Sequence, residues 1–565
     1  MIPQNTELLN VQLPDGSSHS VPPGTEVQNL LNKQRTPTPY PVVGAKLNNS
    51  IVALSHPIQK SGTLFPVDLG SIDGALIARR TLTFILCVAA KETFPLLNLR
   101  VSHSLDHGYY VQFYLNGEER RNGEEIRLSP ADVRHLELAM HSLVEARHPI
   151  LRRVMERTQA IELFRENGMH EKAELLAQVT KERVSVYELK GHVNHFYGLL
   201  APSTDRVSAF ELRHLAGGVN LRFARTSNPL EVPPSRPGKK IFTVLEEYDD
   251  WMHIINFRTV RQLNRIILED KAKDYVMIAE ALQEKKLASI AEEIRNHPRK
   301  PRVVLLSGPS ASGKTTTTKR LGIQLRVLGL QPVLIEMDNF FVERERTPKD
   351  QYGEYDFESF DAIDREQLQE CVRRLLQGER VQIPKFNFKK GMPEPGETLQ
   401  LPRNGILILE GIHGLNDQLL PTIPDGMTYK IYASPMTHLS IDDHNRISSA
   451  DARLLRRLVR DIEARGHSPL ETIRRWPSVR RGEEKNIFPY QENADIVFNS
   501  ALAYEIAALK PFAEKALGML NETQPEWSEA QRLLSFLGYF KPICTSCIPH
   551  HSLLREFIGG SCFSY

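Results

Sequence analysis

The chain has 565 residues, a length that favours three to four domains, and its 41% hydrophobic and 25% charged residues are typical of globular proteins. Its 71 Lys and Arg residues nearly balance 69 Asp and Glu residues, so no overall basic excess indicates nucleic-acid binding. Five scattered cysteines give no disulfide framework and predict a reducing cytoplasm. Met1-Ile-Pro-Gln-Asn5 lacks the features of a signal peptide, and the longest apolar run, 81–90, is too short to cross a membrane.

Residues 7–69 have the pattern of a small β-rich module with a turn at Pro14-Asp15-Gly16. The expected elements are strands at 7–13, 18–21, 42–47 and 51–54 and a short helix at 25–32. The stretches Leu13-Pro-Asp-Gly-Ser17 and Gly44-Ala-Lys-Leu-Asn48 resemble the TGS domain, a ubiquitin-like β-grasp found at the front of threonyl-tRNA synthetases and some GTPases. The resemblance implies that this module binds RNA or a regulatory ligand and is not catalytic.

Residues 72–230 have an α+β pattern. Helices are expected at 72–90, at 129–147 and around 158–168, and a strand at 109–114. The order of elements resembles the second additional domain of threonyl-tRNA synthetases, which edits mischarged tRNA. The resemblance depends on His103-Ser-Leu-Asp-His-Gly-Tyr-Tyr110 and on the helix that starts after Ser129, with Pro130 in its first turn.

This sequence differs from that synthetase domain at the residues that bind the metal. The family holds zinc through a His-x-x-x-His pair in its first helix and a later Cys and His, and zinc needs three or four such ligands. Here the helix has the sequence Ala78-Arg-Arg-Thr-Leu-Thr-Phe84, without a histidine pair. We therefore predict that the module binds no zinc and has lost hydrolytic editing. His103 and His107 are interpreted as surface or capping histidines.

Residues 231–300 are predicted to be a connector. The stretch 229–240 is rich in proline, and 249–296 is largely helical, with apolar residues at helical spacing. The helical part ends at His297-Pro298. We expect it to pack between the front modules and the domain that follows.

A glycine-rich motif follows the connector. An apolar run at 303–306 precedes it and a helical pattern at 316–328 follows it, the order of elements in a P-loop. Glycines let backbone N–H groups converge on a phosphate, and the helix N-terminus adds partial positive charge. Lys314 is expected to reach the β- and γ-phosphates and the Thr315 hydroxyl to hold Mg²⁺. The residues expected to bind ATP are Gly308, Pro309, Ser310, Ala311, Ser312, Gly313, Lys314, Thr315 and Thr316.

Residues 301–500 have the pattern of an α/β domain. Four further apolar runs, at 332–336, 405–409, 429–432 and 494–498, are mostly separated by helical patterns, notably at 365–376 and 453–464. This alternation predicts a parallel, doubly wound sheet with right-handed crossovers. Ligands bind such sheets at the carboxyl ends of the strands, so polar residues directly after each run are the candidates for chemistry.

Two carboxylates follow these predicted strands. Asp338 could accept the proton of an attacking hydroxyl, although a helix cap or turn residue is the alternative interpretation. Glu410 could hold Mg²⁺ or its water, and a structural salt bridge is the alternative there.

The stretch 451–466 distributes arginines around an otherwise apolar helix. Arg453, Arg457 and Arg460 fall on one helical face and suit the neutralisation of transferring phosphates. The alternative is a solvated face whose arginines pair with acidic residues of the same helix.

These motifs together match the uridine kinase and phosphoribulokinase family in order and spacing over about 200 residues. The stretches that carry the resemblance are the P-loop, 337–341, 357–364, 381–388, 409–412 and 453–466. The resemblance implies that Asp338 activates a sugar 5′-hydroxyl and that Glu358, where uridine kinases carry Asp, holds the ribose hydroxyls. It also implies a lid of Arg457, Arg460 and Arg465 over ATP.

The acceptor end departs from that family. Uridine kinases recognise the base with a Tyr and, five residues later, a His, whereas this sequence has Phe386 and Gly391. We expect an ATP- and Mg²⁺-dependent nucleoside kinase with loose base preference. Alternatives are a kinase of another small hydroxyl compound, such as a sugar phosphate or pantothenate, and an RNA-binding regulator with an ATP switch. The sequence leaves open the acceptor, the choice between ATP and GTP, and whether the chain forms a homo-oligomer.

The tail, residues 501–565, is predicted to be helical to about residue 520 and rich in loops thereafter. Cys544-Thr-Ser-Cys547 with His550 and His551 has the spacing of half a zinc site, and we interpret the two cysteines as ordinary thiols. The apolar residues near Leu553 are expected to dock on the core.

Overall fold

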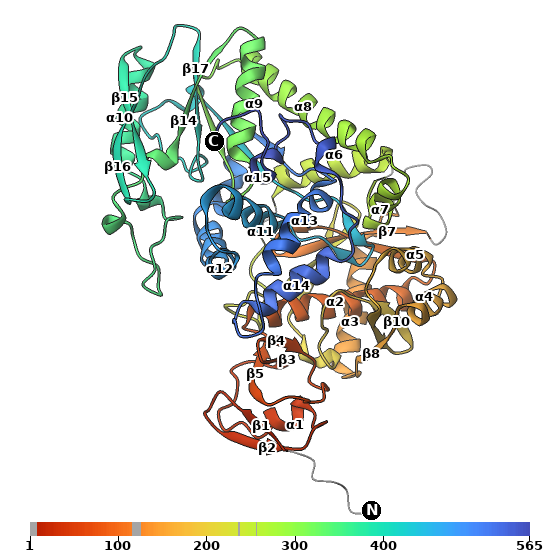
Figure 1. Cartoon of the computed structure of the whole chain (residues 1–565). Helices are drawn as coiled ribbons and strands as arrows, with labels where there is room; N and C mark the ends of the chain where they lie inside the picture. Colours follow the sequence, from red (N-terminus) through yellow and green to blue (C-terminus); the bar gives the residue numbers. More distant parts are fainter. Residues whose placement is uncertain (1–7, 116–125, 236–237, 256) are drawn as a thin grey trace, which may run out of the picture.

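A computed structural model describes residues 8–115, 126–235, 238–255 and 257–565 (Figure 1). Glu7, the expected start of the first strand, Met1–Asn5, and positions 236–237 of the proline-rich connection lie outside these residues. Within them, no helix combines the length and the apolar character that crossing a bilayer requires.

The first module is a mixed five-stranded sheet with a short helix, at the bottom of Figure 1. The sheet order β2-β1-β5-β3-β4 places β1 and β5 side by side in parallel. The elements are β1 (Leu9–Gln12), β2 (Ser18–Val21), α1 (Val27–Leu31), β3 (Val42–Leu47), β4 (Ser50–Val52) and β5 (Gly62–Asp68). Sequence analysis missed β5, because Pro66 lacks the N–H group that strand interiors normally use. The arrangement fits a β-grasp, and its assignment to the TGS family remains a prediction.

The second module has a four-stranded antiparallel sheet covered by helices, followed by a smaller sheet with further helices beside it. The larger sheet has the order β11-β12-β7-β6 and the smaller one β10-β9-β8. Ser129 caps α3 and Pro130 is its first residue, as predicted. The elements are α2 (Ile72–Thr93), β6 (Leu97–Leu105), β7 (Gly108–Leu115), α3 (Pro130–Glu145), β8 (Leu151–Glu156), α4 (Arg157–Glu166), α5 (His170–Gln178), β9 (Arg183–Leu189), β10 (His192–His195), β11 (Phe210–Leu215) and β12 (Gly218–Phe223).

The described residues of the connector form α6 (Lys239–Ile254), α7 (Val260–Leu268) and α8 (Ala272–Asn296). Its last helix, α8, packs against α9 (Lys314–Val327), the helix that follows the P-loop. Leu287, Ile290 and Ile294 of α8 are buried in a cluster that covers one face of the parallel sheet. The connector is therefore part of the wall of the core.

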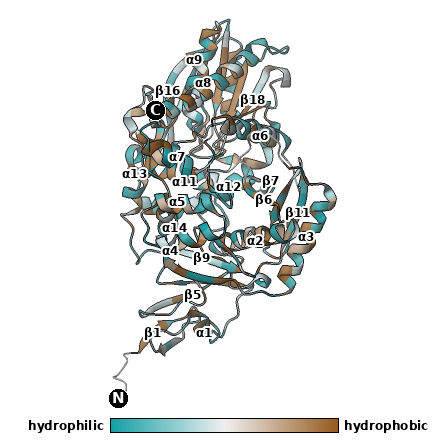
Figure 2. Ribbon diagram, turned by 90° about the vertical axis from the view of Figure 1, so that its right-hand side faces the viewer, coloured by the Kyte–Doolittle hydropathy of each residue, from teal (hydrophilic) through white to brown (hydrophobic). Residues whose placement is uncertain are grey.

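The core contains the predicted parallel sheet, in the order β14-β17-β13-β18-β21 (Figure 1). Every neighbouring pair is parallel, and apolar clusters cover both faces, which explains the continuous apolar runs of these strands (Figure 2). The strands are β13 (Val303–Ser307), β14 (Gln331–Glu336), β17 (Gly405–Glu410), β18 (Thr428–Ser434) and β21 (Ile496–Asn499). A hairpin of β15 (Arg380–Asn387) and β16 (Met392–Gln400) projects from the sheet after α10 (Arg365–Leu376).

The tail has more helix than the sequence predicted. It forms α13 (Glu505–Leu517), α14 (Trp527–Leu537) and α15 (Arg555–Ile558), so the expectation of loops beyond residue 520 is wrong for α14. Ala530, Leu533 and Leu537 of α14 are buried at helical spacing, a signal already present in the sequence. They belong to the largest apolar cluster, which joins side chains from the second module, the connector, the core and the tail.

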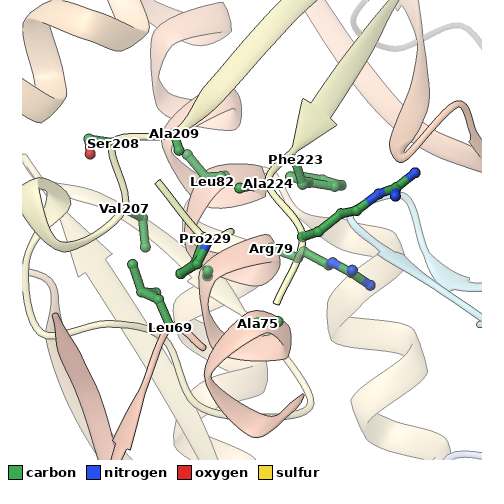
Figure 3. Close-up of a pocket in the computed structure, with 12 residues that line it drawn as sticks. Leu69, Ala75, Arg79, Leu82, Val207, Ser208, Ala209, Phe223, Ala224 and Pro229 are labelled. Carbon is green, nitrogen blue, oxygen red and sulfur yellow. The ribbon is translucent and has the colours of Figure 1, made fainter. Parts of the chain in front are cut away.

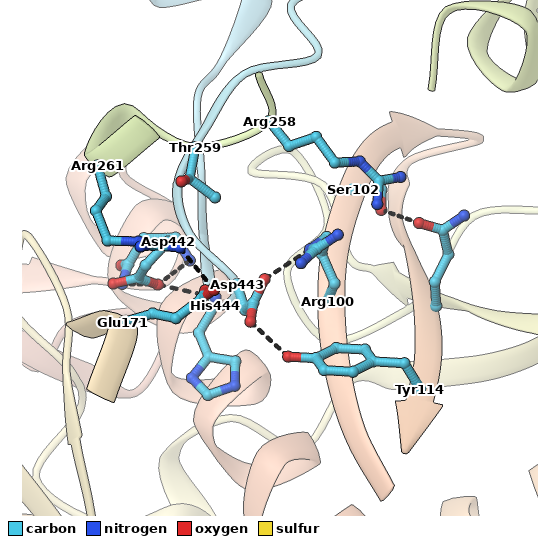
Figure 4. A network of polar contacts seen from close by, with 12 residues as sticks. Arg100, Ser102, Tyr114, Glu171, Arg258, Thr259, Arg261, Asp442, Asp443 and His444 are labelled. Atoms are coloured by element: carbon cyan, nitrogen blue, oxygen red, sulfur yellow. Dashed lines mark hydrogen bonds and ion pairs between the residues drawn. The ribbon is translucent and has the colours of Figure 1, made fainter. Parts of the chain in front are cut away.

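Two neighbouring aspartates, Asp442 and Asp443, connect the second module to the core (Figure 4). Asp443, between β19 (Ser440–Asp442) and β20 (Asn445–Arg446), accepts hydrogen bonds from Arg100 Nε at 2.6 Å and Tyr114 Oη at 2.5 Å. Burial alone would raise the pKa of Asp443, but Arg100 and Tyr114 outweigh it and lower the pKa. Asp442 lies 3.4 Å from Lys172 Nζ. The contact between the module and the core therefore consists of charged groups that pair with one another, of which Lys172 and Asp442 are buried.

Candidate active site

The P-loop connects β13 to α9 at the carboxyl edge of the sheet. Gly313 has φ +80°, a conformation that residues with a side chain rarely adopt. Lys314 begins α9, so the positive end of that helix points into the loop. The predicted strand, turn and helix are all present, with Lys314 and Thr315 in the first turn.

The Thr315 hydroxyl and Glu410 meet beside this helix N-terminus. Thr315 Oγ1 donates to Glu410 Oε2 at 3.1 Å, and Lys314 Nζ lies 3.9 Å from Glu410 Oε1. Burial raises the pKa of Glu410 to about 7, Lys314 opposes this shift, and the nearby Asp338 and Glu336 add to it. A mostly buried carboxylate among acidic neighbours, next to a hydroxyl at a phosphate loop, suits Mg²⁺, which binds through few protein oxygens. These residues fit the predicted ion.

Asp338 and Glu358 face the same space from two other segments. Asp338 is exposed in the turn after β14, and its charge influences the pKa of Glu410, Glu358 and Arg465. Glu358 is half-buried, and its buried Oε2 atom has no hydrogen-bond partner within the part of the chain that the structure describes. Burial raises the pKa of Glu358 to about 7, and the charge of Glu483 raises it further. A buried carboxylate oxygen without a partner suits an incoming hydroxyl donor.

The arginines lie on α11 (Ser449–Arg460) and in the π-helical turn Asp461–Arg465 that follows. Arg457 donates to the Ser310 hydroxyl of the P-loop at 3.1 Å. Asp461 lies 3.3 Å from Arg457 and 3.1 Å from Arg460, so one carboxylate orients both guanidinium groups. The predicted lid arginines Arg457, Arg460 and Arg465 are thus gathered beside the phosphate loop, although their role stays a prediction.

Arg453 has a different environment from the lid arginines. Its buried guanidinium pairs with the fully buried Glu483 and donates to the Ser310 carbonyl oxygen at 3.1 Å. Glu483 also accepts the Ser310 N–H at 3.1 Å and pairs with Arg480 at 2.9 Å. Sequence analysis missed Glu483, because nothing in the polar helix α12 (Pro469–Asn486) distinguishes this glutamate from its neighbours. The ion pair holds the P-loop backbone, and direct binding of ATP by Arg453 stays a prediction.

The acceptor end is aromatic. Phe386 is buried, and its ring centre lies 5.6 Å from that of Phe341 and 5.1 Å from that of Phe388. Gly391 has φ +73°, and a Cβ there would lie 2.9 Å from Arg344. A histidine at Gly391 would therefore be strained and would displace Arg344. The site offers stacking faces and one guanidinium where the uridine kinase resemblance leads one to expect a tyrosine and a histidine.

The second module contains two hollows away from this site. A small cavity of about 30 Å³ lies between α2 and β12, with Arg79, Leu82 and Phe223 in its wall (Figure 3). A cleft of about 300 Å³ lies between α2, β9 and α14, and Arg80 and Lys181 line it. Neither hollow contains a histidine pair on α2. Throughout the described ranges, no three His, Cys, Asp or Glu side chains gather as a metal site.

The two histidines that carry the synthetase resemblance, His103 and His107, differ in exposure. His103 is buried, so the prediction of a surface or capping residue is wrong for it, and burial lowers its pKa to about 4. Its ring lies 4.9 Å from that of His438 in the core, a contact between distant segments that the sequence does not reveal. His107 is exposed, as predicted.

The P-loop, the parallel sheet and the acidic residues at the strand ends define a P-loop kinase domain. Residues 303–507 match the profile of the Phosphoribulokinase / Uridine kinase family. These residues form a domain of that family, and the region before them is homologous to threonyl-tRNA synthetases.

The synthetase homology concerns only part of those proteins. The chain is 31% identical over 211 residues to threonine–tRNA ligase of Syntrophotalea carbinolica, and 30% identical over 213 residues to that of Symbiobacterium thermophilum. The alignments cover 37% and 38% of this chain and 32% and 31% of the ligases. The chain therefore spans about a third of the length of these curated relatives.

Two solved structures are similar to the chain. One is a possible uridine kinase from Bacillus stearothermophilus, with 18% identity, 38% of this chain and 98% of that chain covered, and a TM-score of 0.26. The other is D-glycerate 3-kinase from Cryptococcus neoformans, with 15% identity, coverages of 39% and 90%, and a TM-score of 0.27.

Proposed function

We propose that residues 301–500 catalyse phosphoryl transfer from ATP to the 5′-hydroxyl of a ribonucleoside. The observation that carries the proposal is the convergence of Lys314, Asp338 and Glu410 on one space at the carboxyl edge of the sheet, where their charges influence one another. A protein that used ATP only as a switch would need no carboxylate in the position of Asp338.

Each residue has a chemical role in this proposal. Lys314 and the N–H groups of the loop bind the phosphates, and Arg457, Arg460 and Arg465 neutralise charge that develops on the transferring group. Asp338 accepts the proton of the attacking hydroxyl. Glu358 accepts hydrogen bonds from the remaining sugar hydroxyls. Mg²⁺, held through Thr315 and Glu410, supplies neutralisation of the phosphate charge.

The aromatic side chains where the acceptor would bind indicate which class of acceptor the site would take. Stacking on Phe386 is worth about 1–3 kcal/mol for any base, whereas selective recognition needs hydrogen bonds. A nucleoside kinase with this site should therefore discriminate weakly among bases. It should act poorly on 2′-deoxyribonucleosides, because Glu358 would be left without a partner.

Arg344 supports a second candidate. It stands over Gly391, and a guanidinium suits an anionic group better than a neutral base. An acceptor with its own phosphate or carboxylate, such as a sugar phosphate or pantothenate, would use Arg344 in place of the missing base contacts.

An acceptor screen tests both candidates. ADP release would be measured with uridine, cytidine, adenosine, inosine, deoxyuridine, pantothenate and sugar phosphates, with Lys314→Ala protein as the control for contaminating kinases. We expect ribonucleosides to be substrates with kcat/KM values within about 10⁴-fold of one another. Turnover of anionic acceptors alone, abolished in Arg344→Ala, would replace the nucleoside assignment with the second candidate.

A further inference from the structure

A segment of the tail covers the start of α9. Glu556 of α15 accepts a hydrogen bond from Thr316 Oγ1 at 2.6 Å and from the Thr316 N–H at 3.3 Å. The Tyr565 hydroxyl lies 2.8 Å from the same Thr316 oxygen. Lys319, one turn further along α9, donates to the Ser564 carbonyl oxygen and lies 4.8 Å from the centre of the Tyr565 ring. In Figure 1 the label C stands close to α9 and α15.

Apolar contacts hold this segment in place. Leu553, Leu554 and Phe557 are buried in the large cluster formed with α11, α13 and α14. Leu553 touches the P-loop itself, because a Cβ added to Gly313 would lie 2.6 Å from the Leu553 side chain. The carboxylate of Glu556 is thus delivered to α9 by a docked element.

The Glu556 carboxylate lies at the N-terminus of the helix that follows the P-loop. The first N–H groups of a helix have no intrahelical partner and attract anions, and in a P-loop those anions are the phosphates of the nucleotide. Thr316 directly follows Lys314 and Thr315, which are expected to hold the phosphates and Mg²⁺. The Glu556 carboxylate therefore already occupies one of the N–H groups at the start of this helix.

We propose that Glu556 takes the place of a nucleotide phosphate at Thr316, and that the segment Ser552–Tyr565 must move before ATP binds. The inference rests on the proposed function, because it requires the P-loop to bind a nucleotide. The segment competes with ATP within the same molecule. The apparent affinity for ATP is therefore proportional to the fraction of molecules in which the segment is displaced.

A charge-neutral variant tests the competition. Equilibrium binding of ATP with Mg²⁺ would be measured by calorimetry on the full chain, for the wild type, Glu556→Gln and the control Glu292→Gln, an exposed glutamate on α8. The loss of one charged hydrogen-bond acceptor should tighten ATP binding about tenfold in Glu556→Gln. Glu292→Gln should bind like the wild type. Equal affinities in all three proteins would overturn the competition.

A third variant separates this inference from the proposed function. If neither the wild type nor Glu556→Gln binds ATP, the proposed function fails. If both bind equally and Lys314→Ala weakens binding, the proposed function stands and the competition is wrong.

Hydrogen exchange of the wild type gives an independent readout. We expect ATP to increase exchange of the amides at 553–558, because the segment leaves α9 when the nucleotide binds. Slower exchange would mean that the segment closes over the nucleotide, which would also overturn the proposal.

Discussion

The core and the second module both resemble enzymes, but they differ in whether the side chains of a candidate active site are present. In the core, Lys314, Thr315 and Glu410 come within hydrogen-bond or ion-pair distance at one edge of the sheet. In the second module, the sequence of α2 contains no histidine pair of the kind that the synthetase resemblance leads one to expect.

Arg80 and Phe84 of α2 make packing contacts. The Arg80 guanidinium lies 5.3 Å from the centre of the Tyr197 ring, and Phe84 lies 5.7 Å from Phe196. Contacts of this kind maintain a fold without supplying reactive groups. Resemblance of fold therefore says little about chemistry until the polar side chains have been located.

Replacement of Lys314 tests the core with the largest expected effect. Lys314→Ala should abolish phosphoryl transfer, because the β- and γ-phosphates lose their point charge. ADP release measures the effect. Arg79→Ala in the small cavity of the second module is the matched control and should leave turnover unchanged. Normal turnover in Lys314→Ala would refute the P-loop interpretation.

Asp338→Asn separates proton transfer from binding. The variant is nearly isosteric but cannot accept a proton, so we expect kcat to fall roughly 10²-fold or more with little change in ATP affinity. Steady-state kinetics and calorimetry on the same preparation give both quantities. A kcat within a few-fold of the wild type would make Asp338 structural and direct attention to Glu358.

We expect the carboxyl group of Glu358 to make the free energy of unfolding depend on pH. Its pKa is raised to about 7 in the folded chain by burial, so the folded state binds the proton more tightly than the unfolded state. Its contribution to stability is complete below the unfolded pKa near 4.5 and is lost as pH rises towards 7. The loss amounts to at most about 3 kcal/mol.

Glu358→Gln should remove this dependence. Urea unfolding of the wild type and the variant at pH 5 and pH 8 measures it, and the variant should gain stability relative to the wild type at pH 8. A stability difference that is the same at both pH values would show that the Glu358 carboxylate is not desolvated in the folded protein.

The smallest expected effect belongs to the second module. We expect less than one zinc per chain and no hydrolysis of mischarged aminoacyl-tRNA, because the histidine pair of α2 is absent from the sequence. Metal analysis of the full chain tests this. The same analysis of the Cys547→Ser variant shows whether any metal that is found is bound by the cysteines of the tail. One zinc per chain that persists in that variant would contradict the comparison between the two regions.

Local patterns determined much of this protein. The P-loop, the five parallel strands and the cap of α3 at Ser129 could be predicted, because buried strands, glycine-rich turns and helix caps depend on neighbouring residues. The family of residues 303–507 was also predictable, because its motifs are short stretches in a fixed order.

Tertiary structure decided the contacts that join distant segments. Glu483 holds the Ser310 backbone across 173 positions, and Glu556 reaches Thr316 across 240. The burial of His103 against His438 and the attachment of Asp443 to Arg100 also depend on how modules dock. Such pairs carry no periodicity or spacing, because only the packing of whole elements brings them together.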